Sequence, residues 1–115
     1  MAASVTKFKV DQAEGILVLR GVLLDGVAAT SNGEWFDVSG FSAFSVQISG
    51  ITTATVKVCV SNKPTQPDAT DHGIEKGSLT ADGSVEIICS YRWIKARISA
   101  WTTGSISAWL AGVCK

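Results

Sequence analysis

The feature that most constrains the fold of this chain is an alternation of apolar and polar residues in its second half. In residues 44–49 and 55–61 the even-numbered positions are apolar, and the same parity holds in residues 93–101 and 105–110. Successive side chains of a β-strand point to opposite faces. The alternation therefore predicts four half-buried strands whose even-numbered residues face a core.

Turn residues separate these stretches, and no segment repeats apolar residues at the spacing of a helix. The Asp82-Gly83 step favours a hairpin, and residues 102–104 (Thr-Thr-Gly) predict a tight hairpin between the last two strands. Further strands are expected at residues 16–24, 34–38 and 85–89. The fold class predicted is all-β, an antiparallel, jelly-roll-like β-sandwich of eight or nine strands.

The length fits a single domain. The chain has 115 residues, 46% of them apolar and 17% charged, which is enough to bury a core. We expect residues 15–115 to form the β-sandwich and residues 1–14 to form an N-terminal arm, in which residues 5–10 are either a strand or part of the arm. Residues 62–73 hold both prolines and form the longest polar segment, so they are predicted to be an exposed loop.

The charge balance argues against several partners. Ten basic and ten acidic residues cancel, so the chain has no electrostatic footprint for nucleic acid or anionic lipid. The longest apolar stretch, residues 16–24, is interrupted by Arg20 and is too short to span a bilayer. No signal peptide is visible, and three cysteines form no disulfide framework. We expect a soluble protein made in a reducing cytoplasm, and its neutrality suits a protein that assembles.

No residue pattern predicts catalysis, a cofactor or a metal. The one histidine, His72, lies near Asp68 and Asp71 in the long loop, but a metal site needs more donors at suitable spacing. His72 is expected to be a solvated loop residue. The three cysteines are expected to be inert and reduced, with Cys59 on an outer strand face where a partner would cover it. They are Cys59, Cys89 and Cys114.

Three tryptophans share the odd parity that faces away from the predicted core. They are accompanied by two basic residues of the same parity, and together they form the candidate protein-contact face: Trp93, Lys95, Arg97, Trp101 and Trp109. Large apolar groups mixed with Arg and Ser on an outer face are typical of contact surfaces. The alternative is that a loop, the N-terminal arm or strand ends cover the tryptophans within one molecule.

The order of several short motifs resembles the small β-sandwich virion proteins of tailed bacteriophages. The resemblance covers residues 33–112, about two-thirds of the chain. Its motifs are GFSAFSVQISG at residues 40–50, ATVKV at 54–58, LTADGS at 79–84, YRWIKARI at 91–98 and TGSISA at 103–108.

This resemblance implies a capsid decoration or cement protein that binds and stabilises the major capsid shell in the virion. The implied partners are the major capsid protein and copies of the chain itself, as a dimer or trimer, and no enzymatic activity is implied. A tail or head–neck component of the virion is one alternative. Another is a carbohydrate- or receptor-binding module, because aromatic rows on sandwich faces can stack on sugar rings.

Overall fold

A computed structural model describes residues 9–13, 16–88 and 91–114 of the chain. These residues contain seven strands and no helix, so no helix in this part of the chain could cross a membrane. The strands are β1 (Lys9–Ala13), β2 (Ile16–Val27), β3 (Phe36–Asp37), β4 (Ala43–Ser61), β5 (Ile74–Leu79), β6 (Gly83–Ile87) and β7 (Trp93–Cys114). The predicted all-β, antiparallel class is confirmed.

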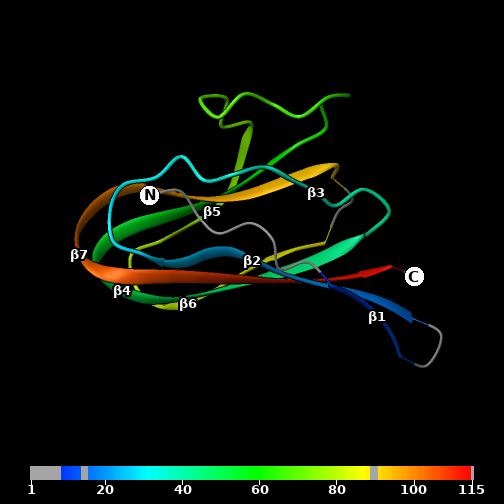
Figure 1. The fold of residues 1–115 in the computed structure, drawn as a ribbon, viewed down its shortest axis with the longest axis horizontal. Coiled ribbons are helices and arrows are strands. Elements are labelled where there is room, and N and C mark those ends of the chain that lie inside the picture. Colours follow the sequence, from blue (N-terminus) through cyan, green and yellow to red (C-terminus); the bar gives the residue numbers. More distant parts are fainter. Residues whose placement is uncertain (1–8, 14–15, 89–90, 115) are drawn as a thin grey trace.

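Strands β4 and β7 form the spine of the fold. They pair antiparallel along almost their whole length, from Ala43 opposite Val113 to Ser61 opposite Trp93. The spine bends over, so that its two halves face each other in Figure 1. The lower layer of that view holds β1, β2, β6 and the β4–β7 pairing of residues 43–49 with 107–113. The upper layer holds β3, β5 and the pairing of residues 54–61 with 93–101.

The bend lies where residues 50–54 of β4 meet residues 102–104 of β7, and each of these segments separates two stretches predicted as individual strands. The β4–β7 register shifts repeatedly between Ser49 and Ala54, and shifts of this kind bend a strand pair. Gly50 and Gly104 meet here with φ of 87° and 123°, and a Cβ on Gly50 would overlap the carbonyl oxygen of Ser105. Glycine is required because a larger residue would force the two backbones apart.

The predicted hairpin at residues 102–104 is therefore wrong. Strand β7 runs on through these residues, because β4 follows it round the bend and continues to pair with it. The Asp82-Gly83 step also differs from a paired hairpin, since β5 and β6 each pair with a different half of β4. The Asp82 carboxylate instead accepts a hydrogen bond of 2.8 Å from the Ile51 N–H and holds the bend.

The predicted parity is confirmed by burial. With the exception of Ala100, the even-numbered residues of both halves of β4 and β7 point between the layers and form one core with residues of β2, β3 and β6. Ala100 is exposed, because the register shift between Thr55 and Val56 turns Trp101 toward the core in its place. The most completely buried members from β4 and β7 are Val46, Ile48, Val56, Val58, Val60, Ile94, Ala96, Ile106 and Ala108. The odd-numbered residues therefore decide what each outer face of the molecule can do.

Candidate binding surfaces

The outer face of the upper layer carries a second apolar cluster rather than an open contact surface. Trp93 and Lys95 point away from the main core as predicted, but their exposed fractions are only 8% and 0%. Trp93 packs with Cys59, the partner of Lys95 in the β4–β7 register, and with Trp35 from the segment before β3. The cover over Cys59 thus comes from the chain itself and not from a partner.

The loop of residues 62–73 is tied to the two indoles of this cluster. The Nε1–H of Trp35 lies 3.3 Å from the carbonyl oxygen of Asp68 and 3.2 Å from that of Asp71, and it donates to both. The Nε1–H of Trp93 donates to the carbonyl oxygen of Lys63 at 2.9 Å. Buried indoles need such acceptors, and the loop backbone supplies them.

Lys95 also holds the loop of residues 62–73 through its side-chain amino group. Its Nζ donates to the carbonyl oxygens of Ala69 and Asp71 at 3.2 and 3.3 Å, and it lies 2.9 Å from Nδ1 of His72. It also lies 4.7 Å from the centre of the Trp35 ring, at cation–π distance. An ammonium group has three N–H donors and no acceptor, so Nδ1 of His72 must accept and the ring must be neutral.

We call this arrangement of Lys95, its three acceptors and the Trp35 ring the lysine clasp. Burial lowers the pKa of Lys95. Burial, followed by the charge of Lys95, also lowers the pKa of His72. Burial of His72 and the positive charge of Lys95 both keep His72 in the neutral form that the clasp needs. His72 is therefore an acceptor for Lys95 and not the solvated residue expected from the sequence.

The other charged residues of the upper face lie beside the clasp. Arg97 is half-buried opposite Lys57, and Lys57 forms an ion pair of 3.1 Å with Glu75 of β5. Among the described residues, no group of three His, Cys, Asp or Glu side chains is placed to hold a metal ion. The upper face thus holds its own cover in place over Trp93 and Cys59.

Trp101 and Trp109 do not lie on one face, contrary to the hairpin prediction. Trp101 is half-buried at the bend, where it packs against the main core and donates from Nε1 to the carbonyl oxygen of Gly104 at 2.9 Å. Trp109 lies on the outer face of the lower layer, between Val22 of β2 and Gln47 of β4. With 43% of its surface exposed, it is the open tryptophan of the predicted face.

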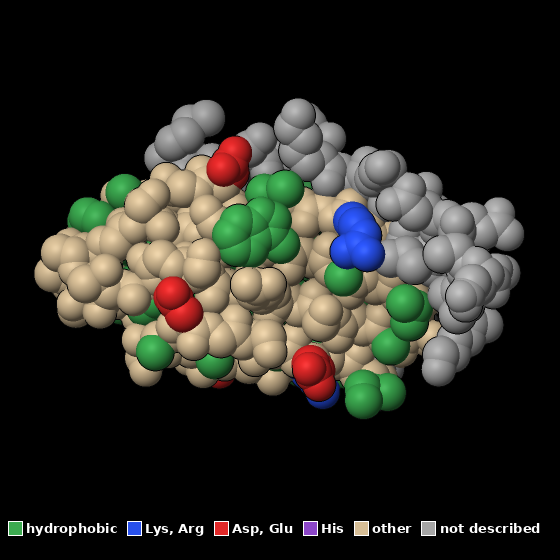
Figure 2. Space-filling view, turned by 90° about the horizontal axis from the view of Figure 1, so that it is seen from below, with side chains coloured by type: hydrophobic (Ala, Val, Ile, Leu, Met, Phe, Trp, Pro, Cys, Tyr) green, Lys and Arg blue, Asp and Glu red, His purple; other side chains and the backbone are tan. Residues whose placement is uncertain are grey.

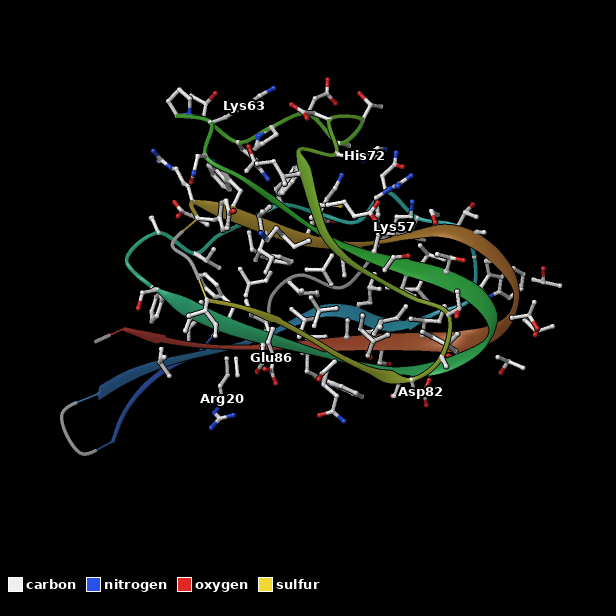
Figure 3. All side chains as sticks on the ribbon, turned by 180° about the vertical axis from the view of Figure 1, so that it is seen from behind. Arg20, Lys57, Lys63, His72, Asp82 and Glu86 are labelled. Carbon is white, nitrogen blue, oxygen red and sulfur yellow. The ribbon has the colours of Figure 1, made fainter. Side chains whose placement is uncertain are left out.

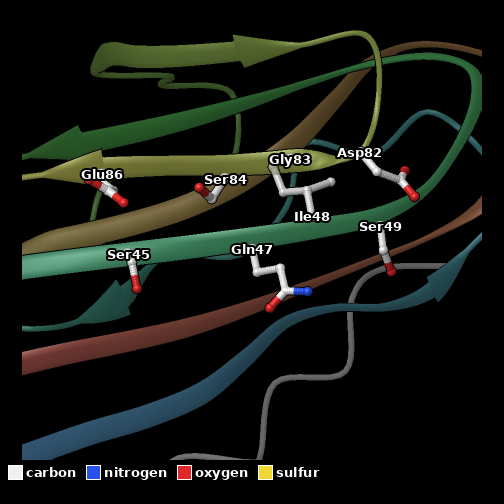
Figure 4. Close-up of a pocket in the computed structure, with 8 residues that line it drawn as sticks. All are labelled: Ser45, Gln47, Ile48, Ser49, Asp82, Gly83, Ser84 and Glu86. Atoms are coloured by element: carbon white, nitrogen blue, oxygen red, sulfur yellow. The ribbon is translucent and has the colours of Figure 1, made fainter.

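The outer face of the lower layer is polar around this ring. Figure 2 shows a largely polar surface with one group of hydrophobic atoms near its middle and smaller groups at its edges. A groove of about 560 Å³ runs along β4 and β6. Figure 4 shows Gln47 and two serines of β4 along one side of it, with side chains of β6 along the other. Its lining residues are Ser45, Gln47, Ile48, Ser49, Asp82, Gly83, Ser84 and Glu86.

One end of the same layer is apolar. A second hollow of about 260 Å³ lies over Phe44 and Gly112, where a Cβ on the glycine would overlap the Phe44 ring. Ile88 stands at its rim with 82% of its surface exposed. We call this hollow and its rim the apolar end. Its remaining apolar lining residues are Ala43, Ala111 and Val113. Sequence reasoning missed it, because Ile88 follows the last inward residue of β6 and breaks the alternation.

Comparison with known proteins identifies the fold but no family. No protein-family model and no curated protein matches the sequence. The crystal structure of the SPBc2 prophage-derived protein YomS matches with a TM-score of 0.67 and 19% identity, over 85% of this chain and 94% of YomS. The chain therefore shares its fold with a small β protein derived from a phage.

Two further solved structures are much more distant. Protein NMB1881 from Neisseria meningitidis has a TM-score of 0.38 and 12% identity, over 93% of this chain and 83% of its own. A mutant of a family 29 carbohydrate binding module has a TM-score of 0.40 and 10% identity, over 95% and 77%. Neither TM-score is high enough to support an argument about fold or function.

Proposed function

We propose that this chain is a structural protein of the phage virion, of the decoration or cement type, which binds and stabilises the major capsid shell. The observation that carries the proposal is the fold shared with a prophage-derived protein over nearly the whole of both chains. The facing halves of the bent sheet support its assignment as a β-sandwich. In this proposal the chain acts by contact and has no enzymatic activity.

The apolar end is the surface that we assign to the shell contact. Ile88 is the most exposed large hydrophobic side chain in the described residues, and the hollow beside it is lined mainly by apolar groups. Exposed apolar patches on small proteins mark contact sites, and a few anchors supply most of the binding energy. We therefore assign Ile88 as the anchor, which would insert into a complementary pocket of the shell protein.

The first experiment measures co-sedimentation of the purified chain with isolated phage shells that lack it. Ile88→Asp is expected to weaken attachment by about 2 kcal/mol, or roughly thirtyfold, because it places a carboxylate in the apolar contact. Ile74→Asp is the matched control, since Ile74 is also exposed, at 51%, but lies on the edge strand β5 of the upper layer. Neither change is expected to alter the free energy of unfolding by more than about 0.5 kcal/mol.

The same assay separates the alternatives. Equal attachment of both variants to the shells would contradict the assignment of the apolar end. Attachment of the wild-type chain to isolated tails or necks instead of shells would replace the capsid role with a tail or head–neck role. Absence from every particle fraction would reject the virion proposal as a whole.

A further inference from the structure

The groove beside Trp109 is a second candidate surface, which adjoins the apolar end at Ser45 and Glu86. We infer that it binds a neutral carbohydrate, with the Trp109 ring as the platform for one sugar unit. This inference goes beyond the virion proposal and does not depend on it. It rests on the order of side chains across three neighbouring strands of the lower layer.

The strand register places an aromatic ring, an amide and a hydroxyl in one row. Trp109 of β7 is directly opposite Gln47 of β4, and Gln47 is directly opposite Ser84 of β6. Side chains that are direct neighbours across a sheet have Cβ atoms about 5 Å apart, so the three lie side by side on the outer face. The apolar C–H face of a sugar ring fits an exposed indole, and its edge would then point along the row.

The neighbouring positions extend this row with further polar groups. Ser45 and Ser49 lie two residues on either side of Gln47 and share its face, and Ser45 is opposite Glu86 of β6. Figure 4 shows these side chains along the groove, with Asp82 at its end near Ser49. Hydroxyl and amide groups can both donate and accept, while a carboxylate accepts two hydrogen bonds from adjacent hydroxyls. This mixture matches the neighbouring hydroxyls of a sugar.

Charge narrows the ligand class. The groove is lined by two carboxylates, Asp82 and Glu86, and by no basic side chain. The nearest basic residue on this face of the described structure, Arg20 of β2, lies beyond β7, in the row that holds Ala111. Phosphate, sulfate and sialic acid groups are therefore disfavoured in the groove. A volume of about 560 Å³ is within the range of small-molecule sites, and the mainly polar lining suits a sugar better than an apolar peptide side chain.

The experiment titrates the wild-type chain with a panel of neutral oligosaccharides of glucose, galactose, mannose and N-acetylglucosamine, with ligand-observed and ¹⁵N-detected NMR. We expect at least one to bind, with the largest shift at the Trp109 indole N–H. Trp109→Ala should weaken that binding by about tenfold or more. Gln47→Ala should weaken it less, and Trp109→Phe should restore part of the affinity because the aromatic platform remains.

Matched controls distinguish this site from the shell contact. Ile88→Asp and Arg20→Ala are expected to leave sugar binding unchanged, while Trp109→Ala is expected to leave shell attachment unchanged. No binding across the panel at millimolar concentrations would overturn the inference, as would binding that survives Trp109→Ala. Loss of shell attachment or of self-association in Trp109→Ala would also overturn it, and would assign Trp109 to a protein partner instead.

Discussion

The two outer faces of the sheet carry tryptophans at equivalent odd-numbered positions, yet only one of these tryptophans is open to solvent. On the upper face, Trp93 is covered by the loop of residues 62–73, which the lysine clasp fastens. On the lower face, Trp109 is 43% exposed and lies beside a polar groove. Figure 3 shows Lys63, His72 and Lys57 on the side of the upper layer, and Arg20, Asp82 and Glu86 on the side of the lower one. An aromatic outer residue is therefore structural where the chain supplies its own cover and available for binding where it does not.

The most direct test of this difference between the faces is to replace one tryptophan on each face with alanine. Trp93→Ala should lower the free energy of unfolding by about 3 kcal/mol, because it empties a buried cluster and leaves the carbonyl of Lys63 without its indole donor. Trp109→Ala should lower it by less than about 1 kcal/mol. Urea unfolding followed by circular dichroism measures both, and equal losses would show that Trp109 is also structural.

A smaller effect is expected from removing the charge of the clasp. Lys95→Met keeps most of the apolar stem but leaves two carbonyl groups and His72 without their donor, so we expect a loss of about 2 kcal/mol. Lys57→Met is the control. Its ion pair with Glu75 is partly exposed and should contribute less than about 1 kcal/mol. If the two variants were equally stable, the clasp would not hold the loop.

The smallest expected effect is a pH dependence of the closure of the loop of residues 62–73 over Trp93. The folded pKa of His72 is lowered, by burial first and then by Lys95 and Arg97, while Asp71 opposes the shift. With the loop open, His72 binds a proton more readily, so closure is most stable above the ordinary histidine pKa of about 6.5. That stability should fall as the pH drops from there through the lower folded value, because a protonated Nδ1 can no longer accept from Lys95.

Hydrogen exchange of loop amides between pH 7.5 and pH 5, corrected for intrinsic rates, measures this opening. His72→Asn is the control, because its amide oxygen can accept in place of Nδ1 but does not titrate. The variant should show the same protection at both pH values. Amides near the groove of Trp109, such as that of Gln47, should not respond to pH in either protein. A wild-type loop with equal protection at both pH values would contradict the role of His72.

Much of the framework could be predicted from local sequence. The even-odd pattern correctly assigns Val46, Val58, Ile94 and Ile106 to the core, because side-chain direction in a strand depends only on position along it. The same pattern correctly sends Trp93 and Trp109 outward. The prediction from turn residues was wrong at residues 102–104, where a glycine step typical of a hairpin lies within a bent continuous strand. The same residues can form a hairpin turn or a bend in a continuous strand. Which of the two forms depends on pairing with a strand that is distant in the sequence.

The amino-acid sequence by itself determined an all-β chain, most of its core parity and the outward direction of Trp93 and Trp109, but not the inward packing of Trp101. Only the tertiary structure decided which of those aromatic residues are covered. The alternation is a local property of each strand, whereas the cover over Trp93 depends on Lys95 and His72, which are 23 residues apart and meet only when the loop folds back. The apolar end and the groove beside Trp109 likewise exist only because β4 pairs with both β6 and β7.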